Sequence, residues 1–277
     1  GFPMEKITSR QNKTVREAAA LLSSAEERAA RGEFLCEGAR LCQDAARSGI
    51  EVLRCFVTAQ ALEKYAAYLR PVLERARQSY LVADHVAGLL SSTKSPQGVF
   101  CQCRWPQGLL AGDAAGGGSC AVLEDLQDPG NLGTILRSCD ALGADGLILT
   151  GHGVDLYDPE VIVSSMGSFF RVPAVRAADN NSVFQFIESL RQRYPGFQVL
   201  GTTAHKQYPL YGQDLTGPVL LMVGNETQGL CYAFKEGCDR LVTIPMAEPS
   251  YASSFNVACA ATVMLYEVSR QRALNTP

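Results

Sequence analysis

Four absences narrow the class of protein to which this 277-residue chain can belong. No apolar run approaches the roughly 20 residues that a membrane-spanning helix requires, so we expect no membrane partner. The first residues lack the charged start and apolar stretch of a secretory signal peptide, which makes a cytoplasmic location the expectation. No G-x-G-x-x-G motif follows an apolar strand pattern, and no P-loop motif is present. The usual dinucleotide-binding fold, and the methyltransferases that share its glycine-rich loop, are therefore disfavoured.

The sequence also offers little that could hold a metal ion. Its ten cysteines include no C-x-x-C pair; Cys101 and Cys103 are the closest two, and most of the ten lie in apolar stretches. In a chain of this size without a secretion signal, such cysteines are typical of buried free thiols. The three histidines share no ligand spacing. We therefore expect no metal site.

Charge is distributed unevenly along the chain. The formal net charge is −3, which by itself argues weakly against a nucleic-acid partner. Residues 1–107 nevertheless contain 15 basic and 11 acidic side chains, whereas residues 108–277 contain 10 and 17. Phosphate binding requires local positive charge rather than a basic total. The first part is thus compatible with nucleic-acid binding, although a solvated helix face explains the same residues equally well.

A glycine-rich segment divides the chain into two parts. Residues 108–119 are small, flexible and nearly uncharged, which is typical of a linker. Before it, alternating helical and strand patterns predict a compact α/β domain over residues 1–107. After it, residues 120–277 alternate more regularly, and their strands are apolar enough to be buried on both faces. Such strands require a parallel sheet covered by helices, and ligands of these sheets bind beyond the strand C-termini.

The second part can be divided into elements by pattern alone. Apolar runs predict strands at residues 120–126, 146–149, 171–175, 198–202, 219–223 and 241–244. Helical patterns are predicted over residues 132–142, from residue 158 onward, over 182–193 behind a capping box that begins at Ser182, and over 257–270.

Polar residues follow several of these strands. Gly224 comes directly after the strand at 219–223, where a glycine lets a ligand approach the backbone, and Glu226 then lies at the rim. The alternative is a simple loop whose acid favours the dipole of the next helix. At the start of the last helix, Ser253 or Ser254 can act as the cap. If a serine caps the helix, the amide of Asn256 in the first turn is available for another role. It could bind a ligand itself, or it could fix the loop that binds the ligand.

The turn after the first strand of the second part contains a third polar group. Asn131 and Gly133 shape this turn, and Arg137 lies one helical turn further on. An arginine in a buried helix requires an acidic partner. Arg137 could pair structurally with Glu226, Asp128 or Asp125, or it could bind a phosphate through two hydrogen bonds. The residues leave these two possibilities open.

Taken together, these segments resemble the SpoU/TrmH family of RNA 2′-O-ribose methyltransferases. The family pattern of N-x-G-x-x-x-R, G-x-E-x-x-G-L, I-P-M and S-L-N-V corresponds here to residues 131–137, 224–230, 244–246 and 254–257. The N-terminal half resembles the family's RNA-binding domain at residues 7–12, 31–38 and 97–99, so the resemblance covers nearly the whole chain. Two positions depart from the pattern. Phe255 replaces a common leucine, which we expect to be tolerated, and Pro96 stands where histidine is frequent, which leaves the RNA target open.

The resemblance implies a SPOUT fold. In that fold the C-terminal α/β domain has a parallel sheet and a trefoil knot, and a small N-terminal α/β domain binds RNA. It further implies a homodimer that uses S-adenosylmethionine to methylate a ribose 2′-hydroxyl. The resemblance favours ribosomal RNA over transfer RNA as the substrate, because a separate N-terminal domain is typical of ribosomal members. The alternatives are a catalytically inactive RNA-binding relative, a transfer RNA ribose methyltransferase and a related enzyme that methylates a base.

The resemblance also assigns roles to single residues. The catalytic group would comprise Asn131, Arg137, Glu226, Ser254 and Asn256. The cofactor would be held at Thr202, Gly224, Asn225, Ile244, Met246 and Phe255. For the RNA phosphates, the contacts we expect are Arg10, Asn12, Lys13 and Arg31. We expect Arg137 to clamp a phosphate rather than accept a proton, because arginine guanidinium groups stay protonated in proteins.

Overall fold

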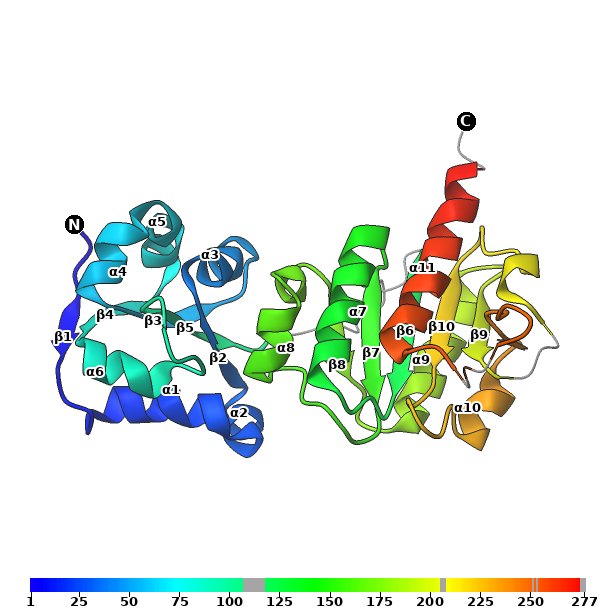
Figure 1. The fold of residues 1–277 in the computed structure, drawn as a ribbon, viewed down its shortest axis with the longest axis horizontal. Coiled ribbons are helices and arrows are strands. Elements are labelled where there is room, and N and C mark those ends of the chain that lie inside the picture. Colours follow the sequence, from blue (N-terminus) through cyan, green and yellow to red (C-terminus); the bar gives the residue numbers. More distant parts are fainter. Residues whose placement is uncertain (107–117, 205–207, 251, 253, 275–277) are drawn as a thin grey trace. The chain divides into compact units, whose positions relative to one another are not determined.

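The computed structural model describes residues 1–106, 118–204, 208–250, 252 and 254–274. Nearly all of the predicted linker therefore lies outside the described residues. The chain divides into two compact units (Figure 1). The first comprises Gly1–Gln107 with Tyr157–Phe170, and the second comprises Gly108–Leu156 with Arg171–Pro277. The division differs from the predicted one in that residues 157–170 pack with the first unit.

The first unit contains a mixed five-stranded sheet in the order β1-β4-β3-β5-β2. The strands are β1 Glu5–Ile7, β2 Glu33–Glu37, β3 Val52–Val57, β4 Gln78–Val82 and β5 Val99–Arg104. The helices are α1 Lys13–Ser23, α2 Ala25–Arg31, α3 Ala39–Arg47, α4 Ala59–Lys64, α5 Ala66–Arg75, α6 Asp84–Ala87 and α8 Pro159–Ser164, with short 3₁₀ turns at Gly88–Leu90 and Ser168–Phe170. Strand β2 is at one edge of the sheet, and α8 packs beside it.

An aromatic cluster holds the segment 157–170 to this edge. Phe34 of β2 is fully buried, and its ring lies 5.5 Å from the rings of both Tyr157 and Phe169. Trp105 stacks on Tyr157 with ring centroids 4.3 Å apart. Edge-to-face and offset contacts of this kind add to the stabilisation that comes from area burial alone. The segment is thus a structural part of the first unit.

The second unit contains six strands, all paired in parallel, in the order β11-β9-β10-β6-β7-β8. The strands are β6 Ser119–Glu124, β7 Gly146–Thr150, β8 Ala174–Arg176, β9 Gln198–Thr202, β10 Val219–Val223 and β11 Arg240–Val242. The helices are α7 Pro129–Leu142, α9 Asn180–Arg193, α10 Tyr232–Gly237 and α11 Val257–Leu274, with a 3₁₀ turn at Leu210–Gly212. The predicted parallel sheet is confirmed.

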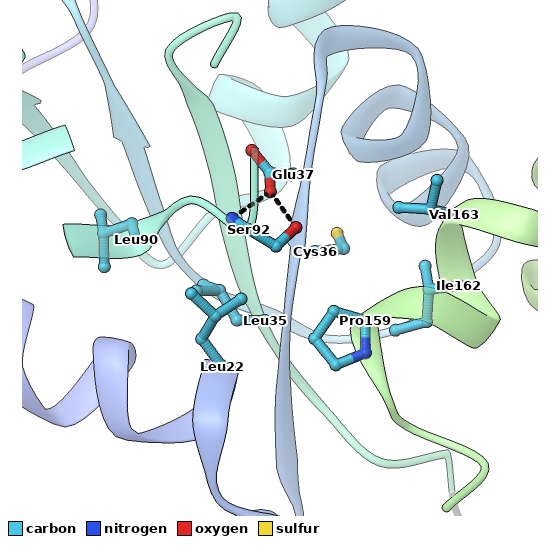
Figure 2. A pocket seen from close by; sticks show the side chains of 9 residues that line it. All are labelled: Leu22, Leu35, Cys36, Glu37, Leu90, Ser92, Pro159, Ile162 and Val163. Carbon is cyan, nitrogen blue, oxygen red and sulfur yellow. Dashed lines mark hydrogen bonds between the residues drawn. The ribbon is translucent and has the colours of Figure 1, made fainter. Parts of the chain in front are cut away.

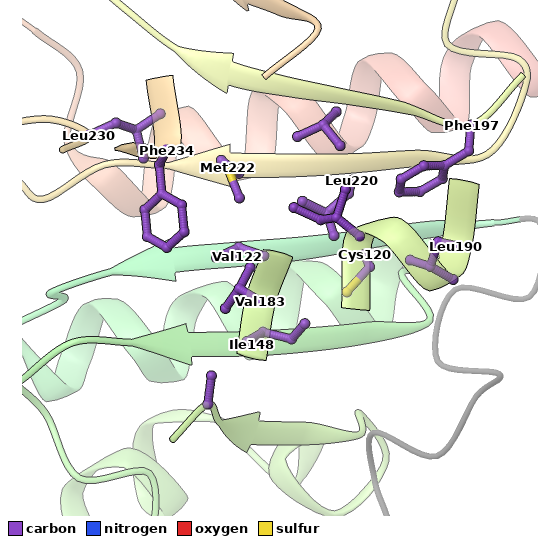
Figure 3. Close-up of a cluster of buried hydrophobic side chains, with 13 residues drawn as sticks. Cys120, Val122, Ile148, Val183, Leu190, Phe197, Leu220, Met222, Leu230 and Phe234 are labelled. Carbon is purple, nitrogen blue, oxygen red and sulfur yellow. The ribbon is translucent and has the colours of Figure 1, made fainter. Parts of the chain in front are cut away.

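The central strands of this sheet are buried on both faces, as their apolar sequences require. Every residue of β6, β7 and β10 is buried. On one face, side chains of α9 and α10 pack on alternate strand residues to form a core that includes Val122, Ile148, Leu220, Val183 and Phe234 (Figure 3). The remaining strand residues face the layer that contains α7 and α11, which pack against each other (Figure 1).

The cysteines occupy mostly interior positions. All ten are free thiols, of which seven are buried, Cys231 and Cys238 are half-buried, and Cys259 is exposed. Burial raises the pKa of Cys139 to about 12, so this thiol stays protonated at neutral pH. The expectation of buried free thiols is confirmed for the seven and is wrong for Cys259. Within the part of the chain that the structure describes, no helix has the length and apolarity to cross a membrane.

Several predicted element ends are wrong by a few residues. The strand expected at 171–175 begins later, at Ala174, and the strand expected at 241–244 already ends at Val242. Helix α9 is capped by Asp179 rather than by Ser182. The Asp179 Oδ1 atom accepts hydrogen bonds from Ser182 N at 2.8 Å and from Ser182 Oγ at 2.9 Å. An acidic side chain satisfies the orphan N–H groups of a first turn as well as serine does, and it also complements the dipole.

The capping assignment predicts a graded pair of variants. Asp179→Ala removes the acceptor of the first-turn N–H and is expected to lower the melting temperature by on the order of 2 °C. Ser182→Ala removes only the hydroxyl donor, so its effect is expected to be smaller. The hydrogen bonds from Ser182 lower the pKa of Asp179 in the folded protein. The contribution of this cap to the stability of the fold is therefore fully present above the ordinary carboxyl pKa, and it is lost as pH falls through the lowered pKa of the folded state. Melting curves of both variants at pH 7 and pH 3 test this; equal melting temperatures for the two variants at pH 7 would contradict it.

Candidate active site

Three segments that are far apart in the sequence meet at the C-terminal edge of the second unit's sheet. They are the turn after β6 with the first residues of α7, the loop after β10 and the start of α11. Asn131 and Gly133, which were expected to shape a turn, lie inside α7, because Pro129 and the capping Asp128 start this helix earlier than predicted. Asn225 Nδ2 donates to Asp125 O at 2.8 Å, and Gln127 N donates to Glu226 Oε1 at 3.2 Å. Asn256 Nδ2 donates to Asn131 Oδ1 at 3.2 Å. Because parallel strands end on one side, the fold brings the predicted catalytic residues Asn131, Glu226 and Asn256 to this edge.

Asn256 has two roles at this edge. Its Oδ1 atom accepts from Ala258 N at 2.8 Å and from Cys259 N at 3.2 Å, so it caps α11. Its amide nitrogen meanwhile reaches Asn131. The expectation that Ser254 caps this helix is wrong, and Ser253 lies outside the described residues. An asparagine is favoured here because one side chain supplies both the capping acceptor and a donor to the neighbouring turn.

Gly224 is a glycine for a reason other than the predicted one. A Cβ atom at this position would lie 2.3 Å from Leu230 N and 2.4 Å from the carbonyl carbon of Gly229. The space beside Gly224 is therefore filled by the chain's own backbone rather than left for a ligand. Gly229 closes the loop at a φ of +70° and exchanges backbone hydrogen bonds of 3.2 and 3.0 Å with Asn225.

The side chain of Asn225 is committed to this loop. Its Oδ1 atom accepts from Thr227 N at 2.9 Å and from Gln228 N at 3.0 Å, while its Nδ2 atom binds Asp125 O. These bonds are those of an Asx turn, in which a side chain replaces a backbone partner. Asn225 thus shapes the loop with its side chain, and its backbone N–H and C=O are both engaged by Gly229.

Arg137 is exposed on α7, in contrast to the buried environment that the sequence suggested. Its expected structural partners have other roles. Asp128 caps α7 by accepting from Asn131 N at 2.9 Å, and Asp125 accepts from His152 N at 2.8 Å. Glu226 accepts from Gln127 N rather than from Arg137 or Asn131. Among the described residues, Arg137 has no ion pair or hydrogen bond, which leaves its guanidinium fork available for an anionic ligand.

The remaining predicted cofactor residues lie at the end of β9 and after β11. Thr202 ends β9, and its Oγ1 atom accepts from Gly224 N at 3.3 Å after β10. Ile244 follows β11, which pairs with β9. Met246 is half-buried, with its Sδ atom 4.0 Å from Ser250 Oγ. Phe255 is 42 % exposed, and Ser254 is also exposed, so neither side chain is used by the core.

The residues predicted to bind RNA have mixed positions in the first unit. Lys13 is exposed, and its Nζ atom lies 4.0 Å from Glu17 on the same helix. Arg10 donates to His85 O at 3.0 Å from an exposed position. Asn12 caps α1 by accepting from Val15 N at 3.2 Å. Arg31 forms an ion pair with Glu33 at 3.0 Å and retains 24 % of its side-chain exposure, so it also stabilises the domain.

Two acidic residues that organise this edge were not predicted to do so: Glu124 was not singled out, and Asp125 was considered only as a possible partner of Arg137. Glu124, the last residue of β6, is buried and accepts from Cys231 N at 2.6 Å, which fixes the far end of the loop after β10. Asp125 contacts the loops that follow β7 and β10. Their place at the end of an apolar strand was a usable signal, because polar residues at parallel strand ends point to a site.

A separate small cavity is present in the first unit. It lies between β2, the turn after α6 and α8 (Figure 2). Glu37 at its rim accepts from both N and Oγ of Ser92 at 2.7 Å. The other lining side chains are mostly apolar, and none of the predicted site residues is among them.

Comparison with known proteins gives a consistent result for both parts of the chain. Residues 119–266 match the SpoU rRNA Methylase family, and residues 12–101 match the MRM3-like substrate binding domain. The chain is 38 % identical over 269 residues to a 23S rRNA (uridine(2479)-2′-O)-methyltransferase of Streptomyces viridochromogenes, covering 96 % of this chain and 92 % of the relative. It is 28 % identical to the 23S rRNA (guanosine(2553)-2′-O)-methyltransferase RlmP of Bacillus subtilis, covering 96 % and 99 %.

Solved structures give the same picture over nearly full length. The SpoU methyltransferase AviRb from Streptomyces viridochromogenes, in complex with the cofactor AdoMet, superposes with a TM-score of 0.84 and 34 % identity, covering 95 % of this chain and 99 % of that one. An AdoMet-bound rRNA methyltransferase from Sinorhizobium meliloti gives a TM-score of 0.82 and 30 % identity, covering 96 % and 98 %.

The double role of Asn256 predicts that two variants separate stability from activity. Asn256→Ala loses the cap and is expected to lower the free energy of unfolding by about 1 kcal/mol. Asn256→Ser keeps a capping oxygen, so its free energy of unfolding is expected to stay within a few tenths of a kcal/mol of the wild-type value. Both variants lose the amide donor to Asn131, so both should lose activity to a similar extent. Urea unfolding and a methyl-transfer assay on the same samples test this. Full activity in the serine variant would show that the bond to Asn131 has no functional role.

Proposed function

Because the chain belongs to the SpoU rRNA methylase family, we propose that it transfers a methyl group from S-adenosylmethionine to a ribose 2′-hydroxyl of ribosomal RNA. The observation that carries this proposal is the convergence of Asn131, Glu226 and Asn256 at one sheet edge. The guanidinium of Arg137 on helix α7, which is exposed and has no ion pair within the described part of the chain, supports it. A cytoplasmic location follows from a ribosomal substrate, and the reaction requires no metal.

The cofactor site fits the ends of β9, β10 and β11. These ends present backbone groups near Thr202, Gly224 and Ile244, and Met246 and Phe255 add apolar surface that the core does not use. When bound there, S-adenosylmethionine supplies an activated methyl group, and this chemistry belongs to the cofactor. The chain's own contribution is to align the ribose oxygen with that methyl, which can supply a large part of the rate enhancement.

Arg137 binds the phosphate next to the target ribose and stabilises negative charge that develops on the 2′-oxygen. Its two parallel N–H groups match the geometry of a phosphate. A guanidinium is not a practical proton acceptor, because it stays protonated in proteins. Fixed donors aimed at developing charge are among the largest contributions to catalysis. The bond between Asn131 and Asn256 links the first turn of α7, which precedes Arg137, to the start of α11, and Glu226 holds the turn after β6 through Gln127 N.

The first unit selects the RNA. Lys13 and Arg10 are exposed cations near the N-terminus of α1, and Asn12 and Arg31 hold the same helix in place. RNA recognition commonly combines phosphate contacts with a single-stranded or extruded nucleotide. We assign the substrate domain to residues 1–107, against which residues 157–170 pack, and the methyltransferase domain, with the trefoil knot of the SPOUT fold, to the rest of residues 120–277.

We further infer that the enzyme is a homodimer. Val263 and Tyr266 of α11 are 37 % and 56 % exposed and lie on the same face of the helix. Apolar side chains of this size on one helix face are typical of a surface that a second copy covers.

The reaction itself is tested by incubating the protein with labelled S-adenosylmethionine and unmodified ribosomal RNA. Nuclease digestion and mass spectrometry then identify a 2′-O-methyl nucleoside. A methylated base, or cofactor binding without transfer, would instead favour the alternatives.

The role of Arg137 makes a specific kinetic prediction. Arg137→Ala is expected to lower kcat by roughly 100-fold, in the range seen when a preorganised donor is removed. The affinity for S-adenosylmethionine, measured by calorimetry, should remain nearly unchanged. Arg137→Lys keeps the charge but loses the two-pronged geometry, so its activity should be intermediate. An equal loss of cofactor affinity in the alanine variant would contradict the assignment.

The homodimer can be tested with a matched pair of charge substitutions. Tyr266→Arg is expected to shift the protein from dimer to monomer, because it places a charge in the proposed interface. Tyr232→Arg alters an even more exposed tyrosine, on α10, and should leave the dimer intact. Light scattering coupled to size exclusion distinguishes the two states. A monomeric wild-type protein would refute the homodimer.

A further inference from the structure

Asp125 has an unusual backbone conformation at the point where β6 ends. Its φ is +50°, in the left-handed region that most side chains avoid and that asparagine and aspartate tolerate best. Its N–H still continues the sheet by donating to Thr150 O at 3.0 Å. The left-handed turn therefore begins at this residue, and it sets the directions of the Asp125 carbonyl and carboxylate.

The carbonyl of Asp125 anchors the loop that contains Glu226. It accepts from Asn225 Nδ2 at 2.8 Å, and the same asparagine holds Thr227 N and Gln228 N through its Oδ1 atom. Gln127 completes the contact by donating its N–H to Glu226. The position of Glu226 thus depends on a chain of bonds that starts at the Asp125 backbone.

The carboxylate of Asp125 anchors a second loop, at the end of β7. Its Oδ1 atom accepts from His152 N at 2.8 Å. A Cβ atom at Gly151 would lie 1.9 Å from the same oxygen, so the carboxylate is packed against a glycine that leaves room for it. Val154 N donates to Leu126 O at 2.8 Å and extends the contact. One residue therefore ties the ends of β6, β7 and β10 together.

We propose that Asp125 is a positioning residue for the methyl transfer, and that it acts by holding the Glu226 loop against the end of β6. The inference rests on the proposed function. The position has two requirements. The backbone must be left-handed, which directs the carbonyl toward Asn225. The side chain must offer an acceptor, which binds His152 N. Asparagine meets both, glycine meets only the first, and alanine meets neither.

This ranking defines the test. Asp125→Asn is expected to retain near wild-type kcat, and Asp125→Gly to lose part of it. Asp125→Ala is expected to lose roughly 10- to 100-fold in kcat, the scale expected for a misplacement of about 1 Å in an active site. The KM for RNA should change less than kcat, because the first unit binds the substrate. A uniform loss across the three variants, or no loss in the alanine variant, would overturn the proposal.

Two further measurements separate positioning from general destabilisation. If Asp125 acts through the Glu226 loop, Asp125→Ala combined with Glu226→Gln should be no slower than Glu226→Gln alone, whereas additive losses would refute the connection. Amide hydrogen exchange should rise at Thr227 and Gln228 in the alanine variant and stay unchanged in the asparagine variant. Unchanged exchange in both, with an active wild type, overturns this inference alone. A wild type that transfers no methyl group to RNA overturns the proposed function, and this role with it.

Discussion

Every strand pair in the described sheet of the second unit is parallel, and this constraint determines where the chemistry lies. A parallel strand must be followed by a crossover, so each strand begins on one side of the sheet and delivers its loop on the other. The turn after β6 and the loop after β10 are about 100 residues apart in sequence, yet they meet because β6 and β10 are register partners. Because these strands are buried on both faces, their polar side chains lie at the strand ends. The same burial that stabilises the sheet therefore places the polar groups of the site at its edge.

The site itself is held mainly by hydrogen bonds between side chains and backbone. Asn225, Asn256 and Asp128 each use a side-chain oxygen to satisfy N–H groups of a turn or a helix start. Such local bonds fix the loops. The arrangement leaves Arg137 exposed and unpaired among the described residues, although a guanidinium on a protein surface commonly finds a carboxylate. The loops of this edge are thus fixed by hydrogen bonds, while the guanidinium of Arg137 stays exposed beside them.

The sequence predicted the sheet better than the loops. The apolar run 219–223 could be assigned because burial on both faces leaves an unambiguous pattern, and β10 has those bounds. Residues 131, 226 and 256 could be grouped through the family pattern. The roles of single side chains were less accessible. Gly224 was expected to make room for a ligand, but it makes room for Gly229 and Leu230. Asn256 was expected to follow a cap, but it is the cap. These contacts depend on residues far away in sequence, which periodicity and local propensity do not report.

The aromatic cluster around Phe34 bears on how the protein can be divided in the laboratory. Strand β2, which carries Phe34, lies at the edge of its sheet. In the intact chain, Tyr157 and Phe169 pack against the Phe34 ring. A fragment that ended at the glycine-rich segment would lack both, and it would expose a fully buried phenylalanine on an open strand edge. Exposed edges of this kind recruit further strands, so such a fragment would self-associate. RNA binding by the substrate domain is therefore best measured in the intact polypeptide rather than in a truncated piece.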